Sequence, residues 1–267
     1  MFLKGLLILA SFISPVFSWG SIGHSVIGSI SQDYLTSQSF NQISTLIPDG
    51  NMTAVANWAD EIKKYPEYHW TNSLHFIDTP DWQCNYFYEK DCFNESNDFN
   101  FCVDGAIRNY TSLLQTNKQS DYLKFLIHFV GDIHQPLHCG FKSDRGGNSI
   151  KVHFNHHQTE LHAVWDSGLI EHRIQKYFDN SVDNWINFIK TNYIQKRDNC
   201  VNCSELWGKN SAKLACEYSY VNEEGNKIQS GDYLDETYFE RTIPIIEKQI
   251  ADASINLANI INYLFSV

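Results

Sequence analysis

The segment FLIHFVGDIHQPLH, residues 125–138, combines an apolar helical pattern with polar side chains that include three histidines and an aspartate. His128 and Asp132 are four residues apart, so they lie on one face of a helix. Pro136 ends that helix and lets His138 turn back from the loop that follows. The segment therefore predicts a helix that presents an imidazole and a carboxylate side by side, with a second imidazole nearby.

A second pair repeats this spacing, because His162 and Asp166 are also four residues apart in LHAVWD, residues 161–166. Two helices that each offer His and Asp suggest a metal site between helices. Imidazole with carboxylate suits zinc, and ligand sets that leave positions open for water are catalytic. Either pair alone is more simply a core or capping histidine; both pairs together with His138 favour a metal centre.

Helical periodicity extends over most of the chain and predicts a mainly α fold. The clearest helix is C-terminal, where Ile243, Ile246, Ile250, Ala253, Leu257, Ile260 and Leu264 step by three and four residues. Further helices are predicted at about Ser25 to Leu46, Thr53 to Lys64, Gly105 to Leu114, Asp121 to His134, Leu161 to Tyr177 and Val182 to Tyr193.

The remaining pattern is a short β-hairpin and a long loop. NSIKVHFN, residues 148–155, alternates apolar and polar residues after Gly146-Gly147, which is typical of one strand of a hairpin. Residues 78–102 are rich in Asp, Asn, Cys and aromatics and predict a long loop tied by disulfides. No repeat or linker divides residues 19–267, so we expect one domain.

Residues 1–18 have the pattern of a secretory signal peptide. Lys4 precedes an apolar run from Leu6 to Phe17, and Val16 and Ser18 occupy the small-residue positions before a cut. A membrane anchor is the alternative, but the run is shorter than the ~20 apolar residues of a spanning helix. We therefore expect a secreted protein without a transmembrane anchor, released to the medium or to a lysosome-like compartment.

Seven cysteines in a secreted chain predict three disulfides and one free thiol. Cys92 with Cys102 is the favoured local disulfide and Cys139 the candidate free thiol, although spacing does not fix connectivity. A zinc ribbon is the competing interpretation, but only Cys200 and Cys203 have ligand spacing. Four glycosylation sequons, at Asn51, Asn94, Asn109 and Asn202, fit the secretory route.

The formal net charge of -11 argues against tight, sequence-independent binding of duplex DNA through many phosphates. It does not exclude hydrolysis of nucleic acid in a metal-rich cleft, where bound cations outweigh nearby carboxylates.

Two upstream motifs add candidate ligands. NWADEIKKY, residues 57–65, places Asp60 on a helix, where it could equally be a solvated charge. SLHFIDTPDW, residues 73–82, places His75 and Asp78 in an extended segment. An HD-type phosphohydrolase is a rival class for such ligands, but it relies on an adjacent His-Asp dipeptide that this chain does not contain.

Taken in order, these motifs resemble a known family. WGSIGH (19–24), NWADEIK, LHFIDTPDWQCNY, CVDGAIRNYT, FLIHFVGDIHQPLHCGF, DRGGNSIKV and LHAVWD are similar to the secreted zinc-dependent single-strand-specific nucleases of the nuclease S-one and nuclease P-one type, related to bacterial zinc-dependent phospholipase C. The resemblance implies an endonuclease that cleaves single-stranded RNA and DNA to 5'-nucleotides and removes 3'-phosphates from nucleotides.

The resemblance also implies a site with three zinc ions. Signal cleavage would expose Trp19, whose α-amino nitrogen and carbonyl oxygen bind zinc in this family. By position, one zinc is held by Asp60, His75 and His128; Asp132 bridges it to a second, held by Trp19 and His24; and His138, His162 and Asp166 hold the third. His134 matches no ligand position and is interpreted as structural.

Catalytic and substrate-binding roles follow from the same likeness. Asp60 would orient a water activated between the bridged ions, and Lys63, which could also be a solvated lysine, would neutralise charge in the transition state. Phe76, which could also be core, matches a position that stacks on an unpaired base. Asp78 would accept hydrogen bonds from the base edge, and Asn148 would line the same pocket.

Some questions stay open at the level of sequence. Ser167 and Glu160 depart from residues common in relatives, which leaves base preference and pH optimum undetermined. A phospholipase C activity and a secreted zinc-binding protein without catalysis are the alternative functions. We expect a monomer whose substrates are single-stranded nucleic acid and nucleotides.

Overall fold

The computed structural model describes residues 19–195 and 200–266; the predicted signal peptide, residues 1–18, lies outside this part of the chain. Helices dominate, which confirms the mainly α class. The larger helices are α1 (Ser21–Asp33), α2 (Ser37–Ile43), α6 (Val103–Thr116), α7 (Ser120–Asp132), α9 (Leu169–Tyr177), α10 (Val182–Asn192), α11 (Ser204–Leu214) and α12 (Glu236–Leu264). Short helical elements are η1 (Pro48–Gly50), α3 (Met52–Val55), α4 (Trp58–Ile62), η2 (Pro66–His75), α5 (Tyr88–Asp91), η3 (Pro136–Cys139), η4 (Lys142–Asp144), α8 (Leu161–Ala163), η5 (Val164–Gly168) and η6 (Ala215–Ser219).

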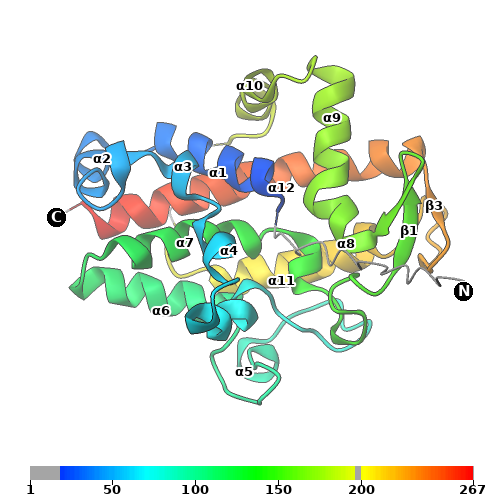
Figure 1. Ribbon diagram of the computed structural model, residues 1–267, viewed down its shortest axis with the longest axis horizontal. Coiled ribbons are helices and arrows are strands. Elements are labelled where there is room, and N and C mark those ends of the chain that lie inside the picture. The colour runs from blue at the N-terminus through cyan, green and yellow to red at the C-terminus, as the bar shows by residue number, and fades with distance from the viewer. Residues whose placement is uncertain (1–18, 196–199, 267) are drawn as a thin grey trace, which may run out of the picture.

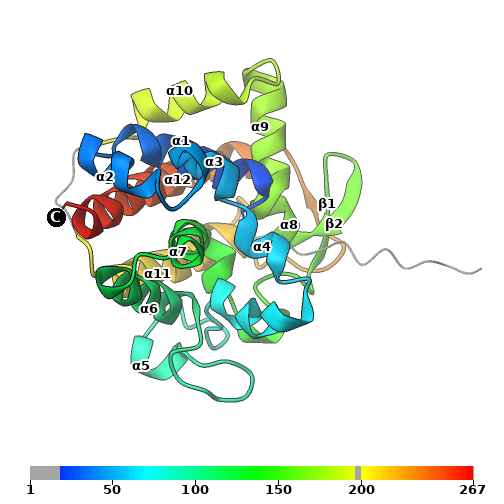
Figure 2. The ribbon, with the colours of Figure 1, turned by 60° about the vertical axis from the view of Figure 1, so that its left-hand side comes forward.

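Helix α7 lies at the centre of the helical packing. It contacts α1, α4, α6 and α12, and Figures 1 and 2 show it enclosed by these elements. This surrounding explains why α7 is apolar on nearly all sides, with Phe125, Leu126, Phe129 and Val130 buried. His128 and Asp132 on α7 are each 0% exposed, so the helix carries two polar side chains into the interior.

A small sheet lies at one end of the molecule (Figure 1). Its strands are β1 (Lys151–Phe154), β2 (His157–Glu160) and β3 (Tyr233–Leu234), in the order β2-β1-β3. β1 pairs with β2 as an antiparallel hairpin in which Lys151 faces Glu160, and it pairs with β3 in parallel. The predicted hairpin is therefore confirmed. Its first strand, Lys151–Phe154, is shorter than the segment 148–155 in which the strand was predicted.

Two of the predicted helices are wrong as single elements. The helix expected from Ser25 to Leu46 is α1 followed by α2, because Thr36 is extended and its hydroxyl accepts the amide hydrogen of Ser39 at the start of α2. The helix expected from Thr53 to Lys64 is α3 followed by α4. Here the carbonyl of Ala56 accepts a hydrogen bond from the His128 ring, at 2.7 Å, instead of continuing the helical ladder.

The helical stretch from Leu161 to Tyr177 is continuous but not uniform. It runs as α8, η5 and α9, and η5 is a wider π-helical turn that contains Asp166. Such turns are rare and recur at functional sites. The prediction of a regular α-helix missed this turn, because residue periodicity does not resolve a local change of pitch.

Other elements differ from the expectation at their ends or were not predicted. α7 ends at Asp132, before the expected His134, and α12 begins at Glu236, where the Asp235 side chain caps it. α11 was missed, as was η2, which makes His75 the last residue of a 3-10 helix rather than part of an extended segment. The predicted loop, residues 78–102, contains one helical turn, α5.

The disulfide pattern contains three bridges and one free thiol, as predicted. Cys92 pairs with Cys102, Cys84 with Cys216 and Cys200 with Cys203, and Cys139 is free and buried. The pairing of Cys84 with Cys216 joins residues 132 positions apart, so no local spacing could have indicated it.

Candidate metal centre

Four side chains from three elements bring one ligand atom each to a common point. Asp60 comes from α4, His75 from the end of η2, and His128 and Asp132 from α7. Among Asp60 Oδ1, His75 Nδ1, His128 Nε2 and Asp132 Oδ2, five of the six distances are 3.0, 3.2, 3.3, 3.5 and 3.6 Å. A tetrahedron around an ion bound at about 2.0–2.1 Å has edges of about 3.3–3.4 Å. The four atoms therefore have the spacing of a tetrahedral zinc site.

The imidazole rings of His75 and His128 are oriented so that one nitrogen of each faces the common point and can bind a metal ion. His128 uses Nδ1 for the Ala56 carbonyl, so Nε2 is the nitrogen that faces Asp60 and Asp132. Burial lowers the pKa of His75 to about 4, with the nearby Lys63 charge acting in the same direction, so its ring is neutral near pH 7. Two imidazoles and two carboxylates converging in the interior form a donor set suited to a divalent cation.

Asp132 connects this group to a second one. Its Oδ2 faces His75 and His128, whereas its Oδ1 lies 3.2 Å from Nε2 of His24 on α1. The His24 and His128 rings are stacked with centroids 3.9 Å apart. Burial disfavours ionisation of Asp132, but the surrounding histidines, His128 first, hold its pKa well below the ordinary value. The carboxylate is thus ionised and placed between two groups of imidazoles.

Trp19 lies directly beside this second group. Its side chain is 0% exposed, and Nε1 donates to the carbonyl of Gly131 at 2.8 Å. The next amide, of Gly20, donates to the carbonyl of Asp166 at 2.7 Å. These two bonds fix the backbone of Trp19 between α7 and η5, at the position where the sequence predicts a terminal ligand.

A third group consists of His138, His162 and Asp166. Nε2 of His162 lies 3.2 Å from Asp166 Oδ2, and Nε2 of His138 lies 3.7 Å from Asp166 Oδ1. Both Nε2 atoms are buried and make no hydrogen bond within the described residues. The opposite nitrogens are occupied, since Nδ1 of His138 donates to the His75 carbonyl and Nδ1 of His162 to the Gly146 carbonyl. This is the arrangement of histidines that bind metal through Nε2.

The structure adds two supporting residues that sequence reasoning missed. Gln135 is fully buried; its Nε2 donates to Asp166 Oδ1 at 2.6 Å and its Oε1 accepts from the Leu137 amide. Gly131 lies against His24, and a Cβ there would be 2.7 Å from His24 Nδ1. A glycine in the interior of an apolar helix was the available signal for Gly131, because glycine is unfavourable there without a packing reason.

The predicted substrate-binding residues border the first group. Phe76 follows His75 and is 37% exposed, so it is not a core residue. Asp78 is half-buried, and burial raises the pKa of its carboxyl, opposed by Lys142. The segment is held beside the His138 turn, because the amides of Ile77 and Thr79 donate to the carbonyls of His138 and Gly140.

The remaining predicted residues have defined surroundings. Lys63 Nζ lies 2.6 Å from Asp60 Oδ1, so it is paired with a candidate ligand. Asn148 Nδ2 donates to the Arg145 carbonyl, and its Oδ1 is buried without a hydrogen-bond partner in the described part of the chain. His134 lies outside the three groups, and its ring bonds to the Val130 carbonyl and to Asn256.

Three adjoining groups of buried imidazoles and carboxylates, next to a partly exposed aromatic ring, are an arrangement that metal-dependent hydrolases use. A sequence model described as S1/P1 Nuclease matches residues 19–266, so the chain belongs to the S1/P1 nuclease family and is a nuclease. Zinc dependence is a property of this family.

Individual relatives cover nearly the whole chain. Endonuclease 3 of Arabidopsis thaliana is 37% identical over 100% of this chain and 95% of its own length. Nuclease P1 of Penicillium citrinum is 31% identical over 91% of this chain and 97% of its own length. Nuclease S1 of Aspergillus oryzae is 29% identical over 91% of this chain and 90% of its own length.

Proposed function

We propose that this nuclease hydrolyses phosphodiester bonds of single-stranded RNA and DNA to 5'-nucleotides, and also removes 3'-phosphates from nucleotides, at a centre for three zinc ions. The observation that carries the proposal is the tetrahedral spacing of Asp60, His75, His128 and Asp132, with the second oxygen of Asp132 directed at His24.

Nine residues would hold the metal ions. Asp60, His75, His128 and Asp132 form the first set; Asp132, His24 and the backbone of Trp19 form the second; His138, His162 and Asp166 form the third. When bound, zinc acidifies water and stabilises the negative charge that develops on a phosphate ester in the transition state. Removal of residues 1–18 would give Trp19 the free α-amino group that its role requires.

Asp60 and Lys63 act next to the scissile phosphate in this proposal. Asp60 holds the attacking water in line through its carboxylate, whose Oδ1 belongs to the first set. Lys63 is 23% exposed at its side chain and lies 2.6 Å from Asp60, so its ammonium is near enough to stabilise charge on the phosphate oxygens.

Single-strand preference follows from base recognition outside the metal centre. An unpaired base can leave its neighbours and stack on Phe76, whereas a base in a duplex cannot. Asp78 accepts hydrogen bonds from the base edge, and Oδ1 of Asn148, which is buried and has no hydrogen-bond partner among the described residues, accepts a further one.

The environment of the protein is part of the same proposal. The disulfides, together with sequons at Asn51, Asn94, Asn109 and Asn202, support entry into the secretory pathway and delivery to the medium or a lysosome-like compartment. Asn51, Asn109 and Asn202 are exposed, whereas Asn94 is half-buried and its amide donates to Asp98. In the described residues, no helix is long and apolar enough to cross a membrane. We propose that residues 19–267 act as one monomeric domain.

Product analysis tests this function. Protein beginning at Trp19 is loaded with zinc and incubated with a short single-stranded RNA, the same sequence as a duplex, and a 3'-mononucleotide. We expect 5'-nucleotides from the single strand, phosphate from the mononucleotide and little cleavage of the duplex. Cleavage of phosphatidylcholine but not RNA would instead identify a phospholipase C, and no turnover by folded, zinc-loaded protein would identify a zinc-binding protein without catalysis.

A further inference from the structure

The loop between Cys92 and Cys102 exposes phenylalanine rings close to the proposed base site. Phe99 is 46% exposed and Phe101 36%, values similar to the 37% of Phe76. Phe99 packs within the loop, with its ring centroid 5.2 Å from that of Tyr88 and 5.3 Å from that of Phe93. Phe101, by contrast, stacks on no aromatic ring of the described residues. Its apolar surface is therefore available to a ligand.

Phe101 lies two residues from a backbone hydrogen bond to Phe76. The amide of Val103 donates to the Phe76 carbonyl at 3.1 Å. Standard chain dimensions then limit the distance between the Cα atoms of Phe76 and Phe101 to at most about 12 Å. Glu95 on the same loop is close enough to Asp78 to help raise the pKa of that carboxyl, after burial, which is the main cause. The loop thus lies beside the residues proposed to bind the base.

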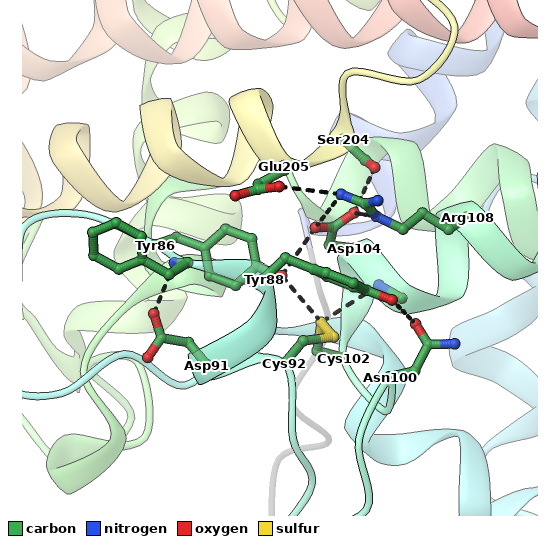
Figure 3. Close-up of a disulfide and its surroundings, with 12 residues drawn as sticks. Tyr86, Tyr88, Asp91, Cys92, Asn100, Cys102, Asp104, Arg108, Ser204 and Glu205 are labelled. Carbon is green, nitrogen blue, oxygen red and sulfur yellow. Dashed lines mark hydrogen bonds and ion pairs between the residues drawn. A yellow bond between two sulfur atoms is a disulfide. The ribbon is translucent and has the colours of Figure 1, made fainter.

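The loop is held in place before any substrate binds (Figure 3). The Cys92–Cys102 disulfide closes it, the Asn100 amide donates to the Cys92 carbonyl, and Tyr88 Oη donates to Asn100 Oδ1 at 2.6 Å. Because this part of the chain is already ordered, stacking on Phe101 would cost little conformational entropy.

A buried carboxylate fixes the base of the loop. Asp104 is 0% exposed and accepts hydrogen bonds from Tyr86 Oη at 2.9 Å, from Ser204 Oγ at 2.5 Å and from Arg108 Nε at 2.8 Å (Figure 3). These contacts join Tyr86 and α6, the helix that directly follows the loop, to α11. Phe101, two residues before Val103, is therefore attached to a rigid part of the molecule.

The charge of the loop indicates what kind of contact it makes. It carries Glu95 and Asp98 between the two cysteines and no Lys or Arg there. Phosphate groups would be repelled rather than bound, so recognition at Phe101 must come from stacking on a base. Such a contribution depends little on salt concentration, unlike binding through lysine and phosphate.

We propose that Phe101 is a second stacking site, which binds the base next to the one on Phe76 in a single strand of two or more nucleotides. This inference rests on the proposed nuclease function and on base binding at Phe76. It makes the loop a determinant of substrate length, because a mononucleotide has no second base to place on Phe101.

The test compares Phe101→Ala with the unmodified enzyme on two substrates, a dinucleoside monophosphate and a 3'-mononucleotide. Stacking on one aromatic ring changes binding about fivefold or more, so we expect kcat/KM to fall by at least that factor for the dinucleoside and to stay unchanged for the mononucleotide. The loss should be the same at low and high salt, and Phe101→Tyr should restore activity. Tyr263→Ala, which removes a remote ring that is 53% exposed on α12, is the matched control.

The results of these variants separate a failure of the second stacking site from a failure of the proposed nuclease function. No loss with Phe101→Ala, or an equal loss on both substrates, overturns the second stacking site. Phe76→Ala serves as the reference, with a loss expected on both substrates. If Phe76→Ala affects neither, base binding at Phe76 is wrong; if the unmodified enzyme hydrolyses neither, the proposed nuclease substrates are wrong.

Discussion

A Cβ atom at position 131 would lie 2.7 Å from Nδ1 of His24, so Gly131 is the residue that lets the His24 ring lie against α7. Gly131→Ala should displace His24 from Asp132 and remove one of the three proposed zinc ions, with a loss of activity of about 10-fold to 100-fold, as expected when the support of a metal ligand is altered. Elemental analysis together with an RNA hydrolysis assay measures both effects. If no steric clash with His24 occurred, alanine would stabilise the helix by about 1 kcal/mol relative to glycine. A Gly131→Ala variant that is more stable and keeps full zinc content and activity would therefore contradict this role.

Asp132 is predicted to be the most sensitive ligand, because each of its oxygens faces a different group of histidines. Asp132→Ala should abolish hydrolysis and reduce bound zinc by more than one ion. Asp121→Ala, which removes an exposed carboxylate paired with Lys124 on the same helix, should change neither. A fully active Asp132→Ala enzyme would disprove the bridging role.

The position of Trp19 predicts that the exact N-terminus matters. Adding one residue before Trp19 should move the α-amino group away from the metal centre and inactivate the enzyme, while the buried indole keeps its bond to Gly131. Mass spectrometry of the terminus, with activity and zinc content, provides the measurement. Full activity of the extended form would show that the amino group is not a ligand.

The buried Asp104 carboxylate should matter for stability. Asp104→Ala leaves the hydroxyls of Tyr86 and Ser204 without their acceptor, and each buried unsatisfied group costs about 1–3 kcal/mol. We expect the free energy of unfolding in urea to fall by at least about 2 kcal/mol. Asp121→Ala, which breaks only a surface ion pair, should cost less than about 1 kcal/mol. Equal stability of the two variants would contradict the importance of the Asp104 contacts.

The spacing of the candidate ligands within a segment could be predicted from the sequence better than the helices that carry them. The spacing of four residues between His128 and Asp132, and between His162 and Asp166, is a local property of a helix, so it could be inferred without tertiary structure. The break between α3 and α4 could not, because it depends on a hydrogen bond from His128 to Ala56, 72 residues away.

The supporting residues were the least predictable part of the site. Gln135 acts through Asp166, and Gly131 acts by the absence of a side chain next to His24. Gln135 has no sequence pattern of its own, and the glycine within an apolar helix signals a packing role for Gly131 without naming its partner, since both roles depend on which helices meet. The helix α11 was also missed. Its first residue, Ser204, donates a hydrogen bond to the buried Asp104, a contact between distant parts of the sequence that no local pattern indicates.

The most direct test of the central claim is a zinc titration during hydrolysis of a single-stranded RNA. Protein beginning at Trp19 is stripped of metal with a chelator, zinc is returned in steps, and the release of 5'-nucleotides is followed at each step. The account predicts no activity without zinc and full recovery at three zinc ions per chain. Undiminished hydrolysis after complete removal of zinc, or full recovery with a single ion, would contradict it.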